Sequence, residues 1–221
     1  MPAEALLFDF DGVIADSEAL SNTVLAEFVT GLGLPMTRDE AIDRYMGKRW
    51  AEAIVAIERD LGHPVPPSFV ADLTTAIHDR CHSDLREVAG VSAFLEAMSA
   101  LPRAIASSST PASLALCLRL LGLSHWFGGH VYSAELVERG KPHPDIYLHA
   151  ASRLGVAPAA CIVVEDSTTG VRAGCAAGMT VIGLCAGSHI RPGHDARLRE
   201  AGAHHVAASW AEAERLIVRM M

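Results

Sequence analysis

The stretch Leu6–Glu18, "LLFDFDGVIADSE", places two aspartates directly after a short apolar run. An apolar run of this length, closed by acids and a glycine, is typical of a buried strand in a parallel sheet. Side chains two residues apart on an extended chain point to the same side, so Asp9 and Asp11 can face one ligand. The stretch therefore predicts the first strand of the fold and the start of a site.

Composition narrows the class of protein. The chain has 221 residues, of which 50% are apolar and 20% charged, so it suits one large globular domain or a core with a modest insert. The formal net charge of −8 disfavours nucleic-acid and anionic-lipid partners. No basic start leads into a long apolar run, so we expect neither a signal peptide nor a membrane span, and a cytoplasmic location. The five cysteines lack a CxxC pair, which predicts reduced thiols rather than disulfides or a zinc site.

The remaining chain divides into two patterns. Between Ser17 and Val88 the apolar residues recur with a helical period and no strand signal interrupts them. From Ala89 onward, the strand-like segments "RAIASSS", "HVYSAE", "ACIVVED" and "TVIGLC" alternate with helical segments. This alternation predicts an α/β core with a parallel sheet covered by helices on both faces. The core would comprise residues 1–16 and 89–221, and residues 17–88 would form a helical insertion after the first strand.

Polar residues follow the predicted strands. In open parallel sheets, ligands bind outside the carboxyl ends of the strands. The residues at those positions, or in the "GKPHPD" loop, are Asp9, Asp11, Ser107, Ser108, Ser109, Lys141, Glu165 and Asp166. Carboxylates that share a pocket repel one another unless a divalent cation lies among them, and a few oxygen ligands favour Mg²⁺. Lysine and hydroxyl donors would bind phosphate.

These residue types suit phosphate-ester chemistry. Phosphate monoesters hydrolyse extremely slowly unaided, so an enzyme must place cations around the transferring group. One carboxylate can attack phosphorus, while a second protonates the leaving alcohol and later activates water. We expect Asp9 to be the nucleophile and Asp11 to be the acid and base.

The segments "DFDGV", "ASSS", "GKPHPD" and "VVEDSTTG", in this order, resemble the haloacid dehalogenase-like hydrolase superfamily across essentially the whole chain. The resemblance is to the branch with a helical cap inserted after the first strand, which includes phosphatases and β-phosphoglucomutases. It implies a Rossmann-like core with an α-helical cap domain, and a Mg²⁺-dependent phosphatase that acts on a small phosphorylated metabolite through an aspartyl phosphate. It implies Asp9 as nucleophile, Asp11 as acid and base, Ser107 and Lys141 as phosphate binders, and Mg²⁺ held by Asp9, the Asp11 backbone carbonyl and Asp166, with Glu165 acting through a water on the metal.

Ser108 is a further candidate for phosphate binding, although Ser108 and Ser109 are also placed to cap the next helix. Asp11 disfavours a dehalogenase, since those enzymes lack the second aspartate. Ser21 stands where mutases similar to this chain have a histidine, which weakens the mutase alternative. The "DSEAL" segment, Asp16–Leu20, is similar to sugar-phosphate phosphatases of the 6-phosphogluconate phosphatase-like type.

The insertion contains "MGKRW", Met46–Trp50. Gly47 would allow a close approach to substrate, and Lys48 or Arg49 would meet its remote anionic group; the alternative is a solvated helix start. Among the histidines, we expect His204 and His205 not to bind metal and His189 and His194 to lie at the surface, while His143 either supports Lys141 or belongs to a plain loop.

A phosphorylation switch of the response-regulator type is the alternative from another functional class. Receiver domains take their acids and phosphoacceptor from different strands and have no helical insert, whereas Asp9 and Asp11 share one loop here, which favours turnover. GxGxxG, Walker A, GxSxG and HExxH motifs are absent from the sequence. The expected partner is a small phosphorylated metabolite, with no nucleic acid or membrane, and the expected state is a monomer or weak homodimer.

Overall fold

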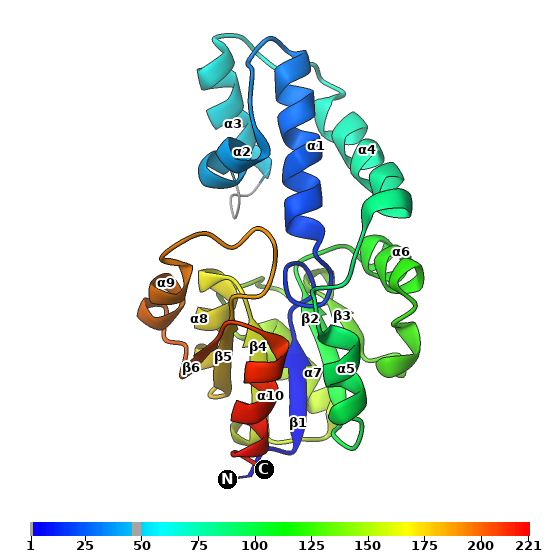
Figure 1. Cartoon of the computed structure of the whole chain (residues 1–221), viewed down its shortest axis with the longest axis vertical. Coiled ribbons are helices and arrows are strands. Elements are labelled where there is room, and N and C mark those ends of the chain that lie inside the picture. Colours follow the sequence, from blue (N-terminus) through cyan, green and yellow to red (C-terminus); the bar gives the residue numbers. More distant parts are fainter. Residues whose placement is uncertain (1, 46–49) are drawn as a thin grey trace. The chain divides into compact units, whose positions relative to one another are not determined.

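The computed structural model describes residues 2–45 and 50–221 and divides the chain into two compact units. The first unit comprises Met1–Asp16 and Arg86–Met221, and the second comprises Ser17–Leu85. Figure 1 traces both units along the chain. Sequence reasoning ended the insertion at residue 88, but Val88 is buried and its N–H donates to the Ile14 carbonyl at 2.9 Å, within the first unit.

A parallel six-stranded sheet in the order β3-β2-β1-β4-β5-β6 forms the centre of the first unit. The strands are β1 (Ala5–Phe8), β2 (Arg103–Ser107), β3 (Val131–Ser133), β4 (Cys161–Glu165), β5 (Thr180–Leu184) and β6 (His205–Ala207). The strand order reverses between β1 and β4, and such switch points are where open α/β sheets bind ligands. The predicted Rossmann-like α/β fold class is confirmed.

Helices connect these strands, and several of them begin at side-chain caps. They are α5 (Val91–Ala97), α6 (Pro111–Leu121), α7 (Asp145–Leu154), α8 (Thr168–Ala176), α9 (His194–Glu200) and α10 (Trp210–Val218), with 3-10 turns η1 (Ser124–Trp126), η2 (Ala134–Leu136) and η3 (Pro158–Ala160). Thr110 accepts a hydrogen bond from the Ser113 N–H at the start of α6, and Gly122 ends that helix with φ +71°. Ser167 caps α8 by accepting from the Gly170 N–H. These caps fix where each loop at the sheet edge ends.

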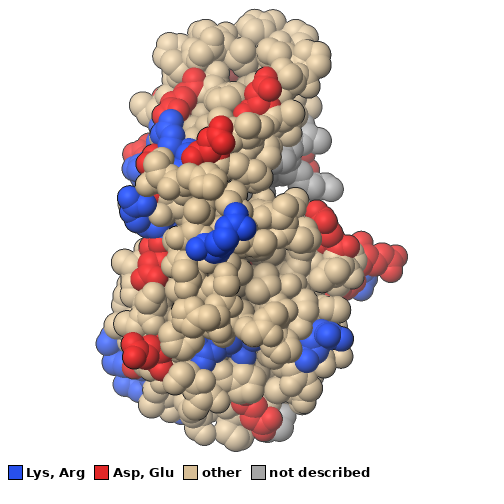
Figure 2. Space-filling view, turned by 90° about the vertical axis from the view of Figure 1, so that its right-hand side faces the viewer, with Lys and Arg blue, Asp and Glu red and all other residues tan. Residues whose placement is uncertain are grey.

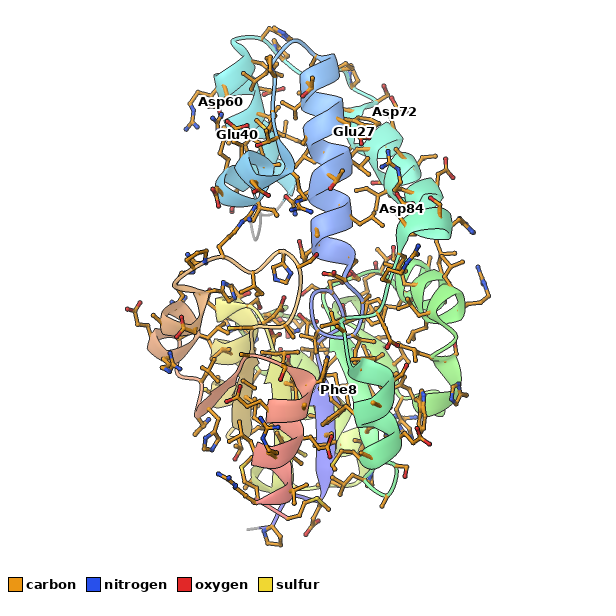
Figure 3. All side chains as sticks on the ribbon, viewed as in Figure 1. Phe8, Glu27, Glu40, Asp60, Asp72 and Asp84 are labelled. Atoms are coloured by element: carbon orange, nitrogen blue, oxygen red, sulfur yellow. The ribbon has the colours of Figure 1, made fainter. Side chains whose placement is uncertain are left out.

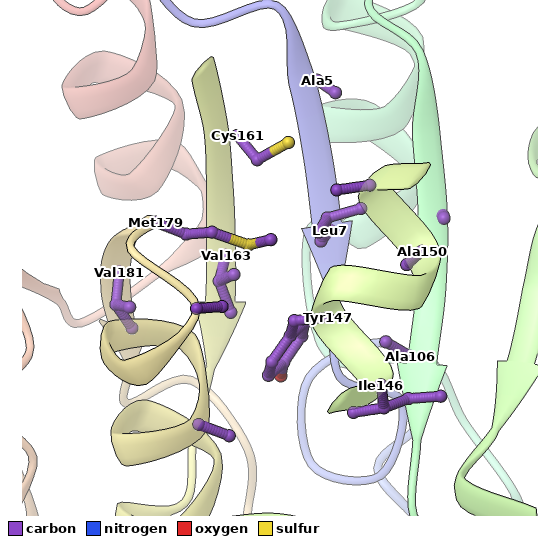
Figure 4. Close-up of a cluster of buried hydrophobic side chains, with 14 of the residues drawn as sticks. Ala5, Leu7, Ala106, Ile146, Tyr147, Ala150, Cys161, Val163, Met179 and Val181 are labelled. Atoms are coloured by element: carbon purple, nitrogen blue, oxygen red, sulfur yellow. The ribbon is translucent and has the colours of Figure 1, made fainter. Parts of the chain in front are cut away.

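Successive residues of β1 pack against opposite faces of the sheet, as strand geometry requires. Leu7 belongs to the buried cluster that α7 and α8 cover, where Figure 4 shows Tyr147 beside the strands. Phe8 lies on the other side, with ring centroids 6.0 Å from Phe94 of α5 and 5.8 Å from Trp210 of α10. β1 is therefore buried on both faces, which explains its continuous apolar run.

The second unit consists of α1 (Ser17–Gly31), α2 (Arg38–Tyr45), α3 (Trp50–Leu61) and α4 (Phe69–Asp84), with no strand among its described residues. Sequence reasoning missed α2, because it is highly charged and buries only Ala41, Ile42 and Tyr45. Figure 3 labels acidic side chains of this unit, among them Glu27 of α1, which lies 2.7 Å from Arg80 of α4.

Neither unit offers a described helix with the length and apolar character needed to cross a lipid bilayer. On the face drawn in Figure 2, basic and acidic side chains are interspersed and do not gather into one basic field.

Candidate active site

The carboxyl ends of β1, β4 and the segment after β3 bring four predicted residues together. Asp9 follows β1, Glu165 ends β4, Asp166 follows it, and Lys141 lies in the loop after η2. Asp9, Glu165 and Asp166 each offer a carboxylate oxygen, and these oxygens lie within 4.8 Å of one another. The convergence that we expected from the strand-end rule is present at the switch point.

Lys141 binds two of these carboxylates at once. Its Nζ lies 2.9 Å from Asp9 Oδ1 and 2.7 Å from Glu165 Oε1, and its side chain is 4% exposed. The ammonium also lies 5.0 Å from the centroid of the Tyr147 ring. Burial by itself lowers the pKa of Lys141, but Asp9 and Glu165 outweigh burial and raise it above its usual value. Lys141 is therefore a fixed positive charge in the site.

Glu165 is fully buried and accepts hydrogen bonds on both oxygens. Oε1 receives Lys141 Nζ at 2.7 Å and the Tyr147 hydroxyl at 2.9 Å, while Oε2 receives the N–H and hydroxyl of Ser167, each at 2.9 Å. Burial raises the pKa of Glu165, but Lys141 and these hydrogen bonds bring it below its usual value. Since a carboxylate has about four acceptor sites, all the hydrogen-bond acceptor sites of Glu165 are occupied. Glu165 is thereby held in place and in turn holds the ammonium group of Lys141.

The other two carboxylates carry the excess negative charge of the site. Burial, followed by the charge of Glu165, raises the pKa of both Asp9 and Asp166 well above the usual range. Lys141 and the Phe10 N–H (2.7 Å) both engage Asp9 Oδ1, so they leave Oδ2 for other partners. Three carboxylates beside one ammonium group, all with hard oxygen donors, fit a divalent cation of the Mg²⁺ type.

The hydroxyl cluster after β2 contacts the acid of the first loop. Ser109 Oγ donates to Asp11 Oδ2 at 2.5 Å, and the Ser109 N–H donates to Ser107 Oγ at 3.0 Å. Ser107 is fully buried, whereas Ser108 is exposed. Thr110, rather than Ser108 or Ser109, provides the side-chain cap of α6. Sequence reasoning placed Ser109 among the hydroxyls at this sheet edge but gave it no role in phosphate binding, and it did not predict the contact with Asp11.

Two histidines that we expected at the surface are buried, so that expectation was wrong. His189 and His194 are 2% and 6% exposed. His189, in the loop after β5, has Nε2 2.9 Å from Asp166 Oδ2, and His194, the first residue of α9, has Nε2 2.5 Å from the Asp166 carbonyl oxygen. By contrast, His143 is exposed. His204 and His205 are also exposed. The predicted substrate-selecting residues Gly47, Lys48 and Arg49 lie outside the described residues.

Fold and site together define an α/β protein with a cluster of acidic side chains, able to hold a cation, at the switch point of a parallel sheet. The family model "Haloacid dehalogenase-like hydrolase" matches residues 6–184. The chain belongs to this family and is a hydrolase.

Relatives and solved structures agree with this assignment. The chain is 28% identical over 190 residues to the 6-phosphogluconate phosphatase of Escherichia coli K12, covering 86% of each. It is 32% identical to the beta-phosphoglucomutase of Mycobacterium bovis, covering 94% of this chain and 90% of the relative. A crystal structure of a HAD family hydrolase from Deinococcus radiodurans with bound phosphate and sodium superposes with a TM-score of 0.87 and 34% identity, covering 99% of this chain and 96% of that one.

Proposed function

We propose that the protein is a Mg²⁺-dependent phosphatase that hydrolyses a small phosphorylated metabolite, a sugar or sugar-acid phosphate, through an aspartyl phosphate at Asp9. One observation carries the proposal. Buried Lys141 pairs with Asp9 and Glu165, and a carboxylate oxygen of Asp166 lies within 4.8 Å of one from each of these acids, close enough for a shared metal ion. That arrangement combines a nucleophile, a fixed cation and carboxylates for a divalent ion. The relative named 6-phosphogluconate phosphatase supports the substrate class.

The proposed reaction has two halves. Asp9 attacks phosphorus, the bond between phosphorus and the alcohol oxygen breaks, and Asp11 gives its proton to that oxygen. In the second half Asp11 takes a proton from water, the water oxygen attacks phosphorus, and the bond to Asp9 breaks to release phosphate. The hydrogen bond from Ser109 to Asp11 Oδ2 supports this role, since it fixes the acid two residues from the nucleophile.

The other site residues would bind the phosphoryl group and the metal. Lys141, Ser107 and Ser108 would donate to phosphate oxygens, in keeping with the charge of the first and the place of the serines at the end of β2. Asp9, Asp166 and the Asp11 carbonyl would hold Mg²⁺, which when bound supplies positive charge for the phosphoryl oxygens. Glu165 would position Lys141, because its four acceptor sites are engaged by protein donors. The expected contact with the metal through water would require a water to replace one of these donors.

A phosphosugar mutase is the second candidate, because the chain is 32% identical to a beta-phosphoglucomutase. Such an enzyme would return the phosphoryl group from Asp9 to a sugar hydroxyl instead of to water. Ser21, standing where similar mutases have a histidine, favours the phosphatase. The cytoplasmic location and the monomeric or weakly dimeric state expected from the sequence, and substrate selection by Gly47, Lys48 and Arg49, remain part of the proposal.

A panel of phosphorylated sugars and sugar acids, assayed for phosphate release with and without Mg²⁺, tests the proposed function. The panel includes 6-phosphogluconate, and also β-glucose 1-phosphate with glucose 6-phosphate followed as product. We expect Mg²⁺-dependent phosphate release that Asp9→Asn abolishes without changing the circular dichroism spectrum. Substantial turnover in Asp9→Asn would defeat the nucleophile assignment, and glucose 6-phosphate without free phosphate would identify the mutase.

A further inference from the structure

A buried histidine contacts the acidic side of the site from a segment that no proposed catalytic role uses. His189 lies in the loop between β5 and α9, and β5 is the sheet neighbour of β4. Because parallel neighbours end at the same edge, this loop reaches Asp166 directly. His189 Nε2 lies 2.9 Å from Asp166 Oδ2, with side chains that are 2% and 5% exposed. The pair is thus fixed and shielded from solvent.

Two glycines make room for this pair. A Cβ on Gly12 would lie 1.9 Å from Asp166 Oδ2 and 2.7 Å from His189 Cε1, and the φ of Gly12 is +77°. A Cβ on Gly187 would lie 2.6 Å from His189 Cε1 and Nδ1. Neither contact is possible with a side chain present, so the imidazole and the carboxylate are packed directly against backbone. A side chain at Gly12 would therefore displace Asp166 or His189, and one at Gly187 would displace His189.

The first residue of α9, His194, contacts the main chain of Asp166. His194 Nδ1 lies 3.0 Å from Arg197 Nη2, and a guanidinium only donates. In neutral His194 the hydrogen is therefore on Nε2, which donates to the Asp166 carbonyl oxygen at 2.5 Å. The loop after β5 therefore contacts the carboxylate of Asp166 through His189, and the start of α9 contacts its carbonyl through His194.

We propose that His189 is a positioning residue for the cation site: it engages Asp166 Oδ2 and so fixes the orientation of the carboxylate that would bind the cation. The inference rests on the proposed role of Asp166 as a metal ligand. Groups that hydrogen-bond a metal-ligating carboxylate fix its orientation, and their loss lowers metal affinity by about 10–100-fold. Replacing His189 should therefore weaken cation binding. It should slow the chemical step only indirectly, through Asp166 and the cation.

Mg²⁺ titration of the metal-free protein by isothermal titration calorimetry tests this inference. His189→Leu removes the donor, His189→Gln keeps an amide N–H donor, and His205→Leu removes an exposed histidine on β6 as the matched control. We expect the Mg²⁺ dissociation constant to rise about 10–100-fold in His189→Leu. It should stay near the wild-type value in His205→Leu and be largely restored in His189→Gln. Turnover of p-nitrophenyl phosphate by His189→Leu should recover at high Mg²⁺ concentration.

Asp166→Asn separates this inference from the proposed function. If Asp166→Asn loses Mg²⁺ affinity while His189→Leu keeps it, the positioning role is overturned and the metal site stands. If Asp166→Asn binds Mg²⁺ as tightly as the wild type, Asp166 is not a metal ligand, and the proposed positioning role of His189 is refuted as well. Equally weak binding in the Leu and Gln variants would indicate packing alone and overturn the inference. If His189→Leu fails to fold, His189→Asn replaces it, because the shorter amide does not reach Asp166. Equal Mg²⁺ affinities of the Asn and Gln variants would then overturn the positioning role of His189.

Discussion

Replacing Gly170 by alanine should dislodge the anchor of Lys141. Gly170 lies in α8, and a Cβ there would be 1.6 Å from Glu165 Oε1 and 1.9 Å from its Cδ, whereas ordinary contacts are 3.4–4 Å. Glu165 must therefore move and release its four donors. Overpacking costs about 1–3 kcal/mol and loss of a buried ion pair about 3–5 kcal/mol, while alanine regains about 1 kcal/mol of helix propensity. The net loss of unfolding free energy should be about 3–7 kcal/mol, a large part of the total stability of a typical domain.

Guanidinium chloride unfolding followed by circular dichroism measures this loss. Gly31→Ala is the matched control, since Gly31 also lies in a helix but no heavy atom lies within 4 Å of its added Cβ. That variant should be as stable as the wild type or more stable by up to about 1 kcal/mol. A Gly170→Ala protein with wild-type stability and phosphatase activity would refute the packing of Glu165 against α8 and its function as an anchor.

Three further outcomes are expected. Arg103→Met should lower the unfolding free energy by about 2–4 kcal/mol in the same assay, because buried Arg103 donates to three backbone carbonyls in and after α5; an unchanged midpoint would contradict this. Tyr147→Phe removes one donor to Glu165 but keeps the ring beneath Lys141, so stability should fall by about 1–2 kcal/mol and kcat should fall with it; wild-type values for both would show that the hydroxyl is dispensable. The Mg²⁺ dissociation constant should rise as pH falls through the raised pKa values of the two site aspartates, because their protonated forms do not bind metal; calorimetry in buffers of different ionisation enthalpy should detect proton release, and pH-independent affinity would contradict it.

The site could be predicted where it follows directly from strand ends. Asp9, Glu165 and Asp166 each lie at or just after an apolar run, and parallel strands end at one edge whatever their order. Local pattern therefore placed these acids together with no knowledge of the sheet order. Lys141 was identified on the "GKPHPD" loop, and the structure pairs it with Asp9 and Glu165.

Contacts that depend on the path of a loop could not be predicted from the sequence, because no strand end fixes where the loop runs. His189 and His194 occupy a segment rich in small and polar residues, which is typical of surface loops, and only the β4–β5 adjacency brings it to Asp166. The helix α2 was missed because its charged residues obscure the helical period. The hydrogen bonds from Tyr147 and Lys141 to Glu165 are also a tertiary result, since both donors lie about 20 residues away along the chain, whereas Ser167 is only two residues away.

The central claim is that Asp9 carries the phosphoryl group during turnover. Borohydride reduces an acyl phosphate to the alcohol, so quenching the enzyme with borohydride during turnover of p-nitrophenyl phosphate with Mg²⁺ should convert Asp9 to homoserine. Peptide mass spectrometry would locate the product. We predict homoserine at position 9 in the wild type, dependent on substrate and Mg²⁺, and none in Asp9→Asn. Reduction at a different acid, or at no residue while phosphate is being released, would contradict the account.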